Sequence, residues 1–314
     1  MSSARVTVVI VTWRSASSIG DCLRPLREAC AAGVCECVVV DNASPDDTRA
    51  ILREHESWAR IVDSGGNIGF GRGCNLGLSA ATTPYVMFLN PDARVDAETI
   101  RTLERFMDQH ERAAIAAPAI HEPNDAVQHV GVRTSPGVIL REASGRPVLR
   151  TPVLPGAAPF RTDWVCGAAM FCRAETIRSL GGFDPRFFLY FEETDLCRRV
   201  EKAGFEIWAV GEAVAHHANA VSARAASRPM FAGCIAEHYF RSRFYYLSKH
   251  WGWFAAAVTE LAEIGIMGTR AAIYSVTGRC GNRFAERMVG PVLRMPGPIP
   301  APSPSVSSPV KGRA

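Results

Sequence analysis

The chain has 314 residues, 47% of them hydrophobic, enough to bury one large α/β domain or two smaller ones. Its 35 basic and 31 acidic residues give a formal charge of +4, which argues against a nucleic-acid-binding protein and leaves open a basic patch facing anionic lipid or a phosphorylated substrate. The ten cysteines form no Cys-x-x-Cys pair, so we expect reduced thiols of a cytoplasmic protein.

The first third of the chain alternates strand-like and helix-like segments. Residues 6–12 and 36–40 are β-branched runs typical of strands buried on both faces, and residues 15–32 repeat apolar side chains at helical spacing. Strands that alternate with helices predict a parallel sheet covered on both faces. The further elements predicted are helices at 46–56, just after the glycine-rich stretch 65–77 and at 96–110, and strands at 61–62, 85–89 and 113–117.

The second half of the chain is less regular. Residues 120–160 are rich in Pro, Gly and Arg, which predicts loops or a β-hairpin. Regularity returns at 164–171, and helices are predicted at 174–180 and from 192 to 203, with short strands at 206–210 and 214–216. Residues 230–278 have a helical pattern, and the Pro- and Ser-rich residues 291–314 predict a disordered tail.

Two predicted strands end in an aspartate. The stretch FLNPDAR, residues 88–94, closes a buried strand with Asn90, Pro91 and Asp92, and Asp41 follows another buried strand. Because ligands bind at the carboxyl ends of parallel strands, we expect Asp41 and Asp92 to share one rim of the sheet. Asn, Pro and Asp are also ordinary turn residues, so a turn that merely closes the strand is the alternative.

Three carboxylates follow the aromatic run 187–191. Glu192, Glu193 and Asp195 lie within four positions, where desolvation and like charge penalise their ionised forms. Such crowding indicates a functional site. The alternative is that the acids occupy the first turn of a helix, where the macrodipole favours them, although a helix start does not require the aromatic run.

Seven stretches stand in order between residues 5 and 225: VTVVIVTWRS, CVVVDNASPD, NIGFGRGCNLGL, MFLNPDAR, WVCGAAMFCRAE, GGFDPRFFLYFEETDLCRR and VAHHANAVS. Together they resemble family 2 glycosyltransferases, in the branch often labelled rhamnosyltransferase-like. The resemblance implies a GT-A fold, an α/β architecture with a mostly parallel central sheet and helices on both faces. It also implies a nucleotide-binding half at about 1–118 and an acceptor half at about 119–228.

The activity implied by the resemblance is transfer of a sugar, with rhamnose suggested by the branch, from a dTDP- or UDP-sugar to an acceptor hydroxyl. The anomeric centre is inverted, and Mg²⁺ or Mn²⁺ sits on the diphosphate. The acceptor is a glycan or a lipid-linked glycan in cell-surface polysaccharide or glycolipid synthesis. A non-catalytic carbohydrate- or nucleotide-binding protein with the same fold is the alternative, which Asn90 and Glu193 keep open because they depart from the family pattern.

The resemblance places the donor at the ends of the first strands. Thr12 and Asp41 match family positions that contact the nucleoside. Asp92 matches the last acid of the Asp-x-Asp metal motif, and Asn90 stands at its first position, so a single carboxylate would hold the cation together with phosphate oxygens and water. Further donor-binding residues implied by the glycine-rich segment are Asn67, Gly69 and Asn75.

The family's second acidic motif is commonly Glu-Asp, with the Asp as the catalytic base. Glu193 stands in its place here with a longer side chain, so Asp195 stays an alternative base. In either case the base would take the proton of the acceptor hydroxyl as that oxygen attacks the anomeric carbon. Packing by the aromatic run is expected to raise the pKa of the base toward neutrality.

The resemblance also implies a histidine ligand for the metal, which we assign to His216. Adjacent strand residues point to opposite faces, so only one of His216 and His217 is expected to reach the site. A satisfied core or surface histidine is the alternative. On the acceptor side the resemblance implies Trp164, Gly167 and Glu192, although a plain buried strand explains the small residues at 167–169 equally well.

The C-terminal region mixes basic and aromatic residues at 241–254, followed by a largely apolar stretch at 255–276 that carries three charges. Those charges argue against a spanning helix and favour an amphipathic helix at the cytoplasmic face of the inner membrane, with Trp and Tyr at the interface and Lys and Arg toward anionic lipid. A helix packed on the catalytic domain or on a dimer partner is the alternative. The predicted organisation is a catalytic domain at 1–228, helices at 229–290 and a tail at 291–314.

The sequence also argues against an exported protein and against a Rossmann dehydrogenase or epimerase. The first residues lead directly into a strand-like run without a signal-peptide pattern, so we expect no export. A Rossmann dehydrogenase or epimerase needs Gly-x-Gly-x-x-Gly after its first strand, and the corresponding turn, residues 12–17, contains no glycine.

Overall fold

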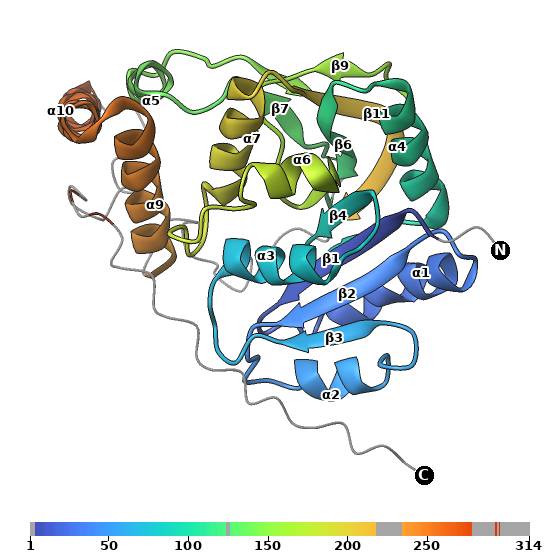
Figure 1. Cartoon of the computed structure of the whole chain (residues 1–314). Coiled ribbons are helices and arrows are strands. Elements are labelled where there is room, and N and C mark those ends of the chain that lie inside the picture. The colour runs from blue at the N-terminus through green and yellow to red at the C-terminus, as the bar shows by residue number, and fades with distance from the viewer. Residues whose placement is uncertain (1–3, 124–125, 218–233, 278–292, 294, 296–314) are drawn as a thin grey trace, which may run out of the picture.

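The computed structural model describes residues 4–123, 126–217, 234–277, 293 and 295. Its centre is a nine-stranded sheet in the order β3-β2-β1-β4-β10-β6-β11-β5, with β9 also paired to β11 (Figure 1). The strands are β1 (Val6–Thr12), β2 (Glu36–Asp41), β3 (Arg60–Asp63), β4 (Tyr85–Leu89), β5 (Ala93–Arg94), β6 (Ala113–His121), β9 (Phe160–Arg161), β10 (Ala169–Arg173) and β11 (Glu206–His217).

The sheet is largely parallel, as predicted, with one reversal near its middle. Strands β1 to β4 pair in parallel, and so do β6 and β11. Strand β10 lies antiparallel between β4 and β6, so β6 and β11 run in the same direction as the first four strands. The carboxyl ends of β1, β2, β4 and β11 therefore share one edge of the sheet, where the segment leading into β10 also lies.

Helices cover both faces of the sheet, because alternate side chains of each buried strand point to opposite sides. Val8 and Ile10 of β1 pack with α1 and α4, whereas Val9 and Val11 pack with α3, α6 and α7. The helices are α1 (Ile19–Ala31), α2 (Thr48–Arg53), α3 (Phe70–Ala80), α4 (Ala97–Gln109), α6 (Ala174–Ser179) and α7 (Glu192–Lys202).

Two local predictions need correction. Within residues 120–160, β7 (His129–Gly131) and β8 (Arg150–Pro152) do form a two-stranded antiparallel sheet, but a helix, α5 (Pro136–Ala143), lies between them. Its start carries a recognisable signal, because the Ser135 side chain accepts a hydrogen bond from Val138 N at 3.3 Å and Pro136 follows the cap. The two strands predicted at 206–216 are one strand, β11, whose register shifts at a bulge between Val210 and Val214.

The predicted helical region is two helices, α9 (Cys234–Trp251) and α10 (Trp253–Thr277), separated at Gly252, where φ is +88°. Phe244, Tyr245 and Tyr246 of α9 are buried in one cluster with residues of the segment before α7. Helix α9 thus packs on the segment before α7, and the expectation that these tyrosines lie at a membrane interface is wrong. Within the described residues, no helix has the length and hydropathy to cross a bilayer.

The division into domains at 1–228 and 229–290 stays a prediction. Residues 218–233, which include the end of the VAHHANAVS stretch, lie outside the described residues, as does the predicted tail at 291–314 apart from residues 293 and 295.

Candidate active site

The ends of β1 and β2 are joined by a buried aspartate. Thr12 and Asp41 are partners in the register of the two strands, and Thr12 Oγ1 donates a hydrogen bond to Asp41 Oδ1 at 3.1 Å. Asp41 also accepts a bond from Ser44 N at 3.2 Å, and its Oδ2 accepts one from Arg49 Nε at 2.6 Å. These bonds hold the loop after β2 at the edge of the sheet where a nucleotide is expected.

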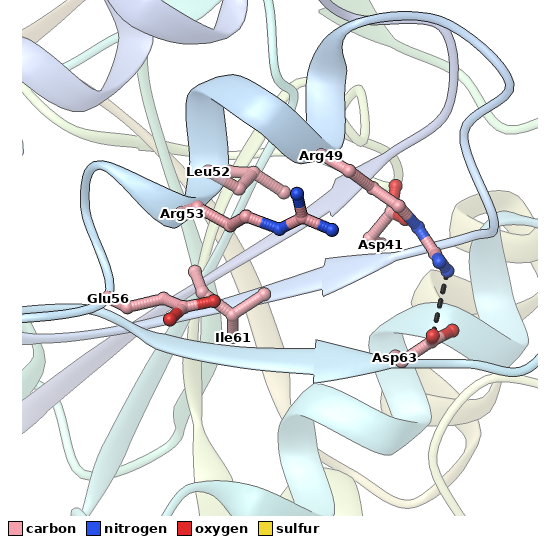
Figure 2. Close-up of a pocket in the computed structure, with 7 residues that line it drawn as sticks. All are labelled: Asp41, Arg49, Leu52, Arg53, Glu56, Ile61 and Asp63. Atoms are coloured by element: carbon pink, nitrogen blue, oxygen red, sulfur yellow. Dashed lines mark hydrogen bonds and ion pairs between the residues drawn. The ribbon is translucent and has the colours of Figure 1, made fainter.

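A cavity of about 240 Å³ opens beside Asp41, between α2 and β3 (Figure 2). Arg49 bridges two other lining residues, because its Nη2 also donates to Asp63 Oδ2 at 2.7 Å. The lining combines charged groups with the apolar Leu52 and Ile61, a combination that suits a polar ring or a sugar. The lining residues are Asp41, Arg49, Leu52, Arg53, Glu56, Ile61 and Asp63.

The glycine-rich segment touches the segment before α7. Gly69 has φ of +89°, and a Cβ added there would lie 2.5 Å from the carbonyl oxygen of Phe188, so this approach requires glycine. The next residue, Phe70, donates its N–H to the same oxygen at 2.9 Å. Asn67 is exposed, and its side chain accepts a bond from Gly69 N at 3.2 Å, which shapes the turn.

Asn75 has both ends of its amide committed to the protein. Its Nδ2 donates to the Phe183 carbonyl and its Oδ1 accepts from the Phe183 N–H, both at 2.8 Å. These two bonds attach α3 to the segment leading to α7, and the donor contact of Asn75 stays a prediction.

The metal-motif aspartate meets a histidine from the end of β11, but it is not the predicted one. Asp92 Oδ1 lies 3.1 Å from His217 Nε2, and the other ring nitrogen of His217 is buried without a partner. His216 is exposed and stacks on His121 with ring centroids 5.5 Å apart. The assignment of His216 as a ligand is wrong because strand alternation turns it to the other face.

Residues 167–168 contact both the FLNPDAR stretch, which carries Asp92, and Glu193 at the start of α7. Asn90 N donates to the carbonyl of Ala168 at 2.9 Å, just before the start of β10. A Cβ added at the neighbouring Gly167 would lie 3.6 Å from Glu193 Cβ. The backbone of residue 167 and the Glu193 side chain are therefore direct neighbours. Asn90, two residues before Asp92, and Glu193 thus both contact residues 167–168.

The two glutamates at the start of α7 occupy different environments. Glu192 is buried with Oε2 lacking a partner, and burial first, then the charge of Glu193, raises its pKa well above the ordinary value. Glu193 is only partly covered. Burial raises its pKa as well, while its own backbone and the Thr194 hydroxyl, 3.3 Å from Oε1, partly oppose that effect. Trp164 Nε1 donates to Thr194 Oγ1 at 3.0 Å, so Trp164 helps to position Glu193.

The turn that presents these acids is strained. Tyr190 and Phe191 both have φ of +68°, a left-handed conformation that costs about 1–3 kcal/mol for each such residue. Helix α9 holds the turn in place, because Ser242 Oγ donates to the Leu189 carbonyl at 2.8 Å and the Phe191 ring packs 5.5 Å from that of Tyr246. The C-terminal helices are thus part of the support of the site.

Asp195 is placed as a structural anchor and not as a base. It is completely buried, and its oxygens accept from Arg199 Nε at 2.7 Å and from His250 Nε2 at 2.8 Å, with Lys249 Nζ at 2.6 Å. Burial alone would raise its pKa, but the His250 hydrogen bond and the charges of Arg199 and Lys249 lower it on balance. No acceptor hydroxyl can reach a carboxylate enclosed in this way, so the alternative base is withdrawn.

Replacing Asp195 with asparagine is expected to lower the free energy of unfolding by about 1.5–3 kcal/mol, because Arg199, Lys249 and His250 lose a charged hydrogen-bond acceptor. The loss is limited because Lys249 keeps Asp184 and Arg199 keeps two backbone carbonyls. The folded-state pKa of Asp195 is lowered, so its contribution is present above the unfolded-state value of about 4 and is lost as the pH falls through the lower folded value. Urea unfolding of the variant should therefore show a flatter decline of stability in acid than wild type. A large loss of kcat at unchanged stability would instead restore Asp195 as a base.

Several residues that shape the site were not predicted. Asn42 Nδ2 donates to the Gly69 carbonyl at 3.1 Å, a contact that its place next to Asp41 could have suggested. Lys249 and His250 reach Asp195 from α9. Their distance in sequence left no local signal.

The family model described as Glycosyl transferase family 2 matches residues 7–166. N-acetylglucosaminyl-diphospho-decaprenol L-rhamnosyltransferase of Mycobacterium tuberculosis is 26% identical over 243 residues, which cover 70% of this chain and 76% of that protein. Rhamnosyltransferase WbbL of Escherichia coli is 26% identical over 200 residues, which cover 59% of this chain and 72% of that protein.

Among solved structures, the mannosyltransferase PcManGT from Pyrobaculum calidifontis, in complex with GDP-Man and Mn²⁺, superposes with a TM-score of 0.58 at 19% identity. The match covers 89% of this chain and 76% of that one. At this identity the likeness shows the fold alone, and it confirms the GT-A architecture that the sequence predicted.

Proposed function

Since the chain belongs to glycosyl transferase family 2, we propose that it transfers a sugar, with rhamnose the first candidate, from a nucleoside-diphosphate donor to an acceptor hydroxyl in cell-surface glycan synthesis. The sugar is suggested by the names of the two rhamnosyltransferase relatives. The name of the mycobacterial relative describes a lipid-linked acceptor, and we propose an acceptor of that class here.

The observation that supports the proposal is that residues 167–168 contact both acidic stretches. Asn90 N donates to the Ala168 carbonyl, Glu193 at the start of α7 lies beside Gly167, and Asp92, two residues after Asn90, pairs with His217. An inverting transfer requires cation ligands for a leaving diphosphate and a base for the attacking hydroxyl, and we propose these two roles for the Asp92–His217 pair and for Glu193.

The residues at Asp92 fit a divalent cation. A carboxylate and an imidazole are both ligands of Mn²⁺, and Mg²⁺ is commonly bound by one or two carboxylates together with phosphate oxygens and water. His217 Nε2 lies 3.1 Å from Asp92 Oδ1, a separation at which the two atoms could bind one cation side by side. A cation bound there would neutralise the charge that develops on the leaving diphosphate.

Glu193 would act as the base. Its partly exposed carboxylate is oriented by Thr194 and Trp164, and its raised pKa makes it a better proton acceptor once it is ionised. Gly167 leaves space for an acceptor beside it. Attack on the anomeric carbon from the side opposite the diphosphate would invert its configuration. Burial and the charge of Glu193 raise the pKa of the neighbouring Glu192, which favours its uncharged form next to the base.

The nucleoside would lie against the ends of β1 and β2. Thr12 and Asp41 border this edge, and the cavity lined by Arg49 and Asp63 adjoins it. Asn67 and Asn90 complete the donor side that we propose, with Gly69 allowing the close approach of the backbone.

A donor screen tests the proposal. Purified protein is incubated with Mg²⁺ or Mn²⁺ and with UDP-, dTDP- and GDP-sugars, and release of nucleoside diphosphate is measured together with metal-dependent binding of each nucleotide. We expect release from one donor that depends on the metal. Absence of both release and binding would contradict the proposal and favour a non-catalytic protein.

The adjacent histidines provide a matched pair of variants. Replacing His217 with alanine is expected to weaken metal activation by at least about tenfold, the loss that even indirect partners of a metal ligand produce. Replacing His216 with alanine removes an exposed ring that stacks on His121 and should leave activation near wild type. The measurement is donor release as a function of Mn²⁺ concentration. Equal effects of the two substitutions would refute the assignment of His217.

A further inference from the structure

Helix α10 turns its charged residues toward the protein. Arg243 of α9 forms buried ion pairs with Glu260, at 2.6 Å, and with Glu263. Arg270 donates a hydrogen bond to the carbonyl of Ala143 at the end of α5. The charged residues of α10 are Glu260, Glu263 and Arg270; the two glutamates are buried, and Arg270 is half-buried and bonded inward.

The outward face of α10 is largely apolar, with Gly265 and Thr269 at its middle and Ser275 beside its end. Its members recur at three- and four-residue spacing, which aligns them in one stripe. Phe254 is 77% exposed and Val276, one helix length away, is 87% exposed. We call this the outer stripe of α10; its exposed members are Phe254, Val258, Leu261, Gly265, Thr269, Ala272 and Val276, flanked by Trp253 and Ile273.

A helix on the surface of a water-soluble domain normally buries its apolar face and exposes its charges. In α10 the arrangement is reversed, although burying an ion pair is costly. Helix α10 lies at the margin of the molecule, beside α5 and the end of α9 (Figure 1). An exposed apolar face this long is expected to bind another apolar surface.

Basic residues lie on the segment that packs against α10. Residues 141–150, from the end of α5 to the start of β8, carry Arg141, Arg146 and Arg150, all exposed, with one compensating acid, Glu142. This loop also exposes Leu149, at 74%. The contact between Arg270 and Ala143 places the segment directly beside the C-terminal half of α10.

We propose that the outer stripe of α10, together with the arginines of residues 141–150, docks on the surface of an anionic lipid bilayer. The helix of 25 residues, about 37 Å long, would lie in the plane of the interface with its apolar side chains among the acyl chains. The arginines would face the negatively charged headgroups, to which basic side chains near a membrane surface are attracted. This charge favours lipid over a second copy of the chain, whose identical arginines would bring like charges to the contact.

Vesicle flotation tests the proposal with the full-length protein and no donor sugar, so its result does not depend on the catalytic proposal. Wild type is expected to float with vesicles of phosphatidylcholine and phosphatidylglycerol. A double variant, Phe254→Glu with Leu261→Glu, should bind at least about tenfold more weakly, because it places charge where two large apolar side chains would be buried. Both positions are exposed, and circular dichroism checks that the fold is kept.

The matched control is Leu76→Glu, which changes a leucine exposed on a different helix, α3, and should leave vesicle binding unchanged. A second variant, Arg141→Glu with Arg146→Glu, should weaken binding to the anionic vesicles and reduce its dependence on salt.

The proposal is overturned if wild type does not bind anionic vesicles, or if the stripe variant binds as well as wild type. It is also overturned if analytical ultracentrifugation without lipid finds a wild-type dimer that the stripe variant loses, while vesicle binding is absent. In that case the stripe is an interface between two copies of the chain.

Discussion

Replacing Glu193 with glutamine is expected to lower kcat by about 10³-fold, within the range that positioned general bases contribute. Glutamine keeps the size and the contact with Thr194 but cannot accept the proton of the acceptor hydroxyl. Binding of the nucleotide should be nearly unchanged, because the substitution lies on the acceptor side of residues 167–168. The measurements are steady-state transfer to acceptor and calorimetric binding of the donor nucleotide.

The neighbouring glutamate provides the control. Glu192 is buried, and burial and the charge of Glu193 raise its pKa well above the ordinary value, so the uncharged glutamine preserves the form that burial favours. Glu192→Gln should therefore change kcat little. If the two variants lost activity equally, or if Glu193→Gln remained active, Glu193 would not be the base.

The assignment of Glu193 as the base also predicts how the reaction depends on pH. A base must be ionised to accept a proton, and burial raises the pKa of Glu193. Lowering the pH through that raised value should therefore reduce kcat, and the residual activity of Glu193→Gln should lack this limb of the profile.

Replacing Asp92 with asparagine is expected to lower kcat/KM for the donor by about 10²-fold or more, because metal coordination supplies several kcal/mol of charge stabilisation. Asn90 has no negative charge to compensate, so the site would lose its carboxylate. The measurement is the rate of donor turnover at increasing Mn²⁺ concentration. Compared with wild type, the variant should need a higher Mn²⁺ concentration for half-maximal activity and should reach a lower maximal rate.

Asp96 is the matched acid four residues along the chain. Its side chain caps α4 by accepting a bond from Thr99 N at 2.8 Å, a role that asparagine also performs well. Asp96→Asn should therefore keep both activity and stability. A normal metal dependence in Asp92→Asn would exclude Asp92 as a ligand.

Most of the fold could be predicted because its signals are local. The β-branched runs of β1 and β2 and the apolar stretch of β4 identify buried strands, and helical spacing identifies α1 and α4. Their alternation implies the parallel sheet, and Asp41 and Asp92 lie at the shared edge that this sheet implies. Helix α5 was missed because its Pro and Gly are poor helix formers, even though Ser135 and Pro136 form a good helix start.

The site could be predicted in its chemistry but only partly in its geometry. The bulge between Val210 and Val214 interrupts the alternation of β11, so the face of each histidine could not be derived by counting along the strand. Asn75 and Asp195 looked like site residues because they stand in motifs that carry functional groups. Their partners, Phe183, Lys249 and His250, come from distant segments and use up their polar atoms.

The amino-acid sequence was sufficient to predict the family, the strand ends that carry Asp41 and Asp92, and the acidic start of α7. Each of these features depends on neighbours within a few residues. Packing between distant segments settled the rest: that His217 and not His216 meets Asp92, that Asp195 is enclosed by cations, and that α10 buries its charges. The physical reason is that burial and ion pairing depend on which side chains meet in space. Residues far apart in the chain leave no local pattern from which those meetings can be derived.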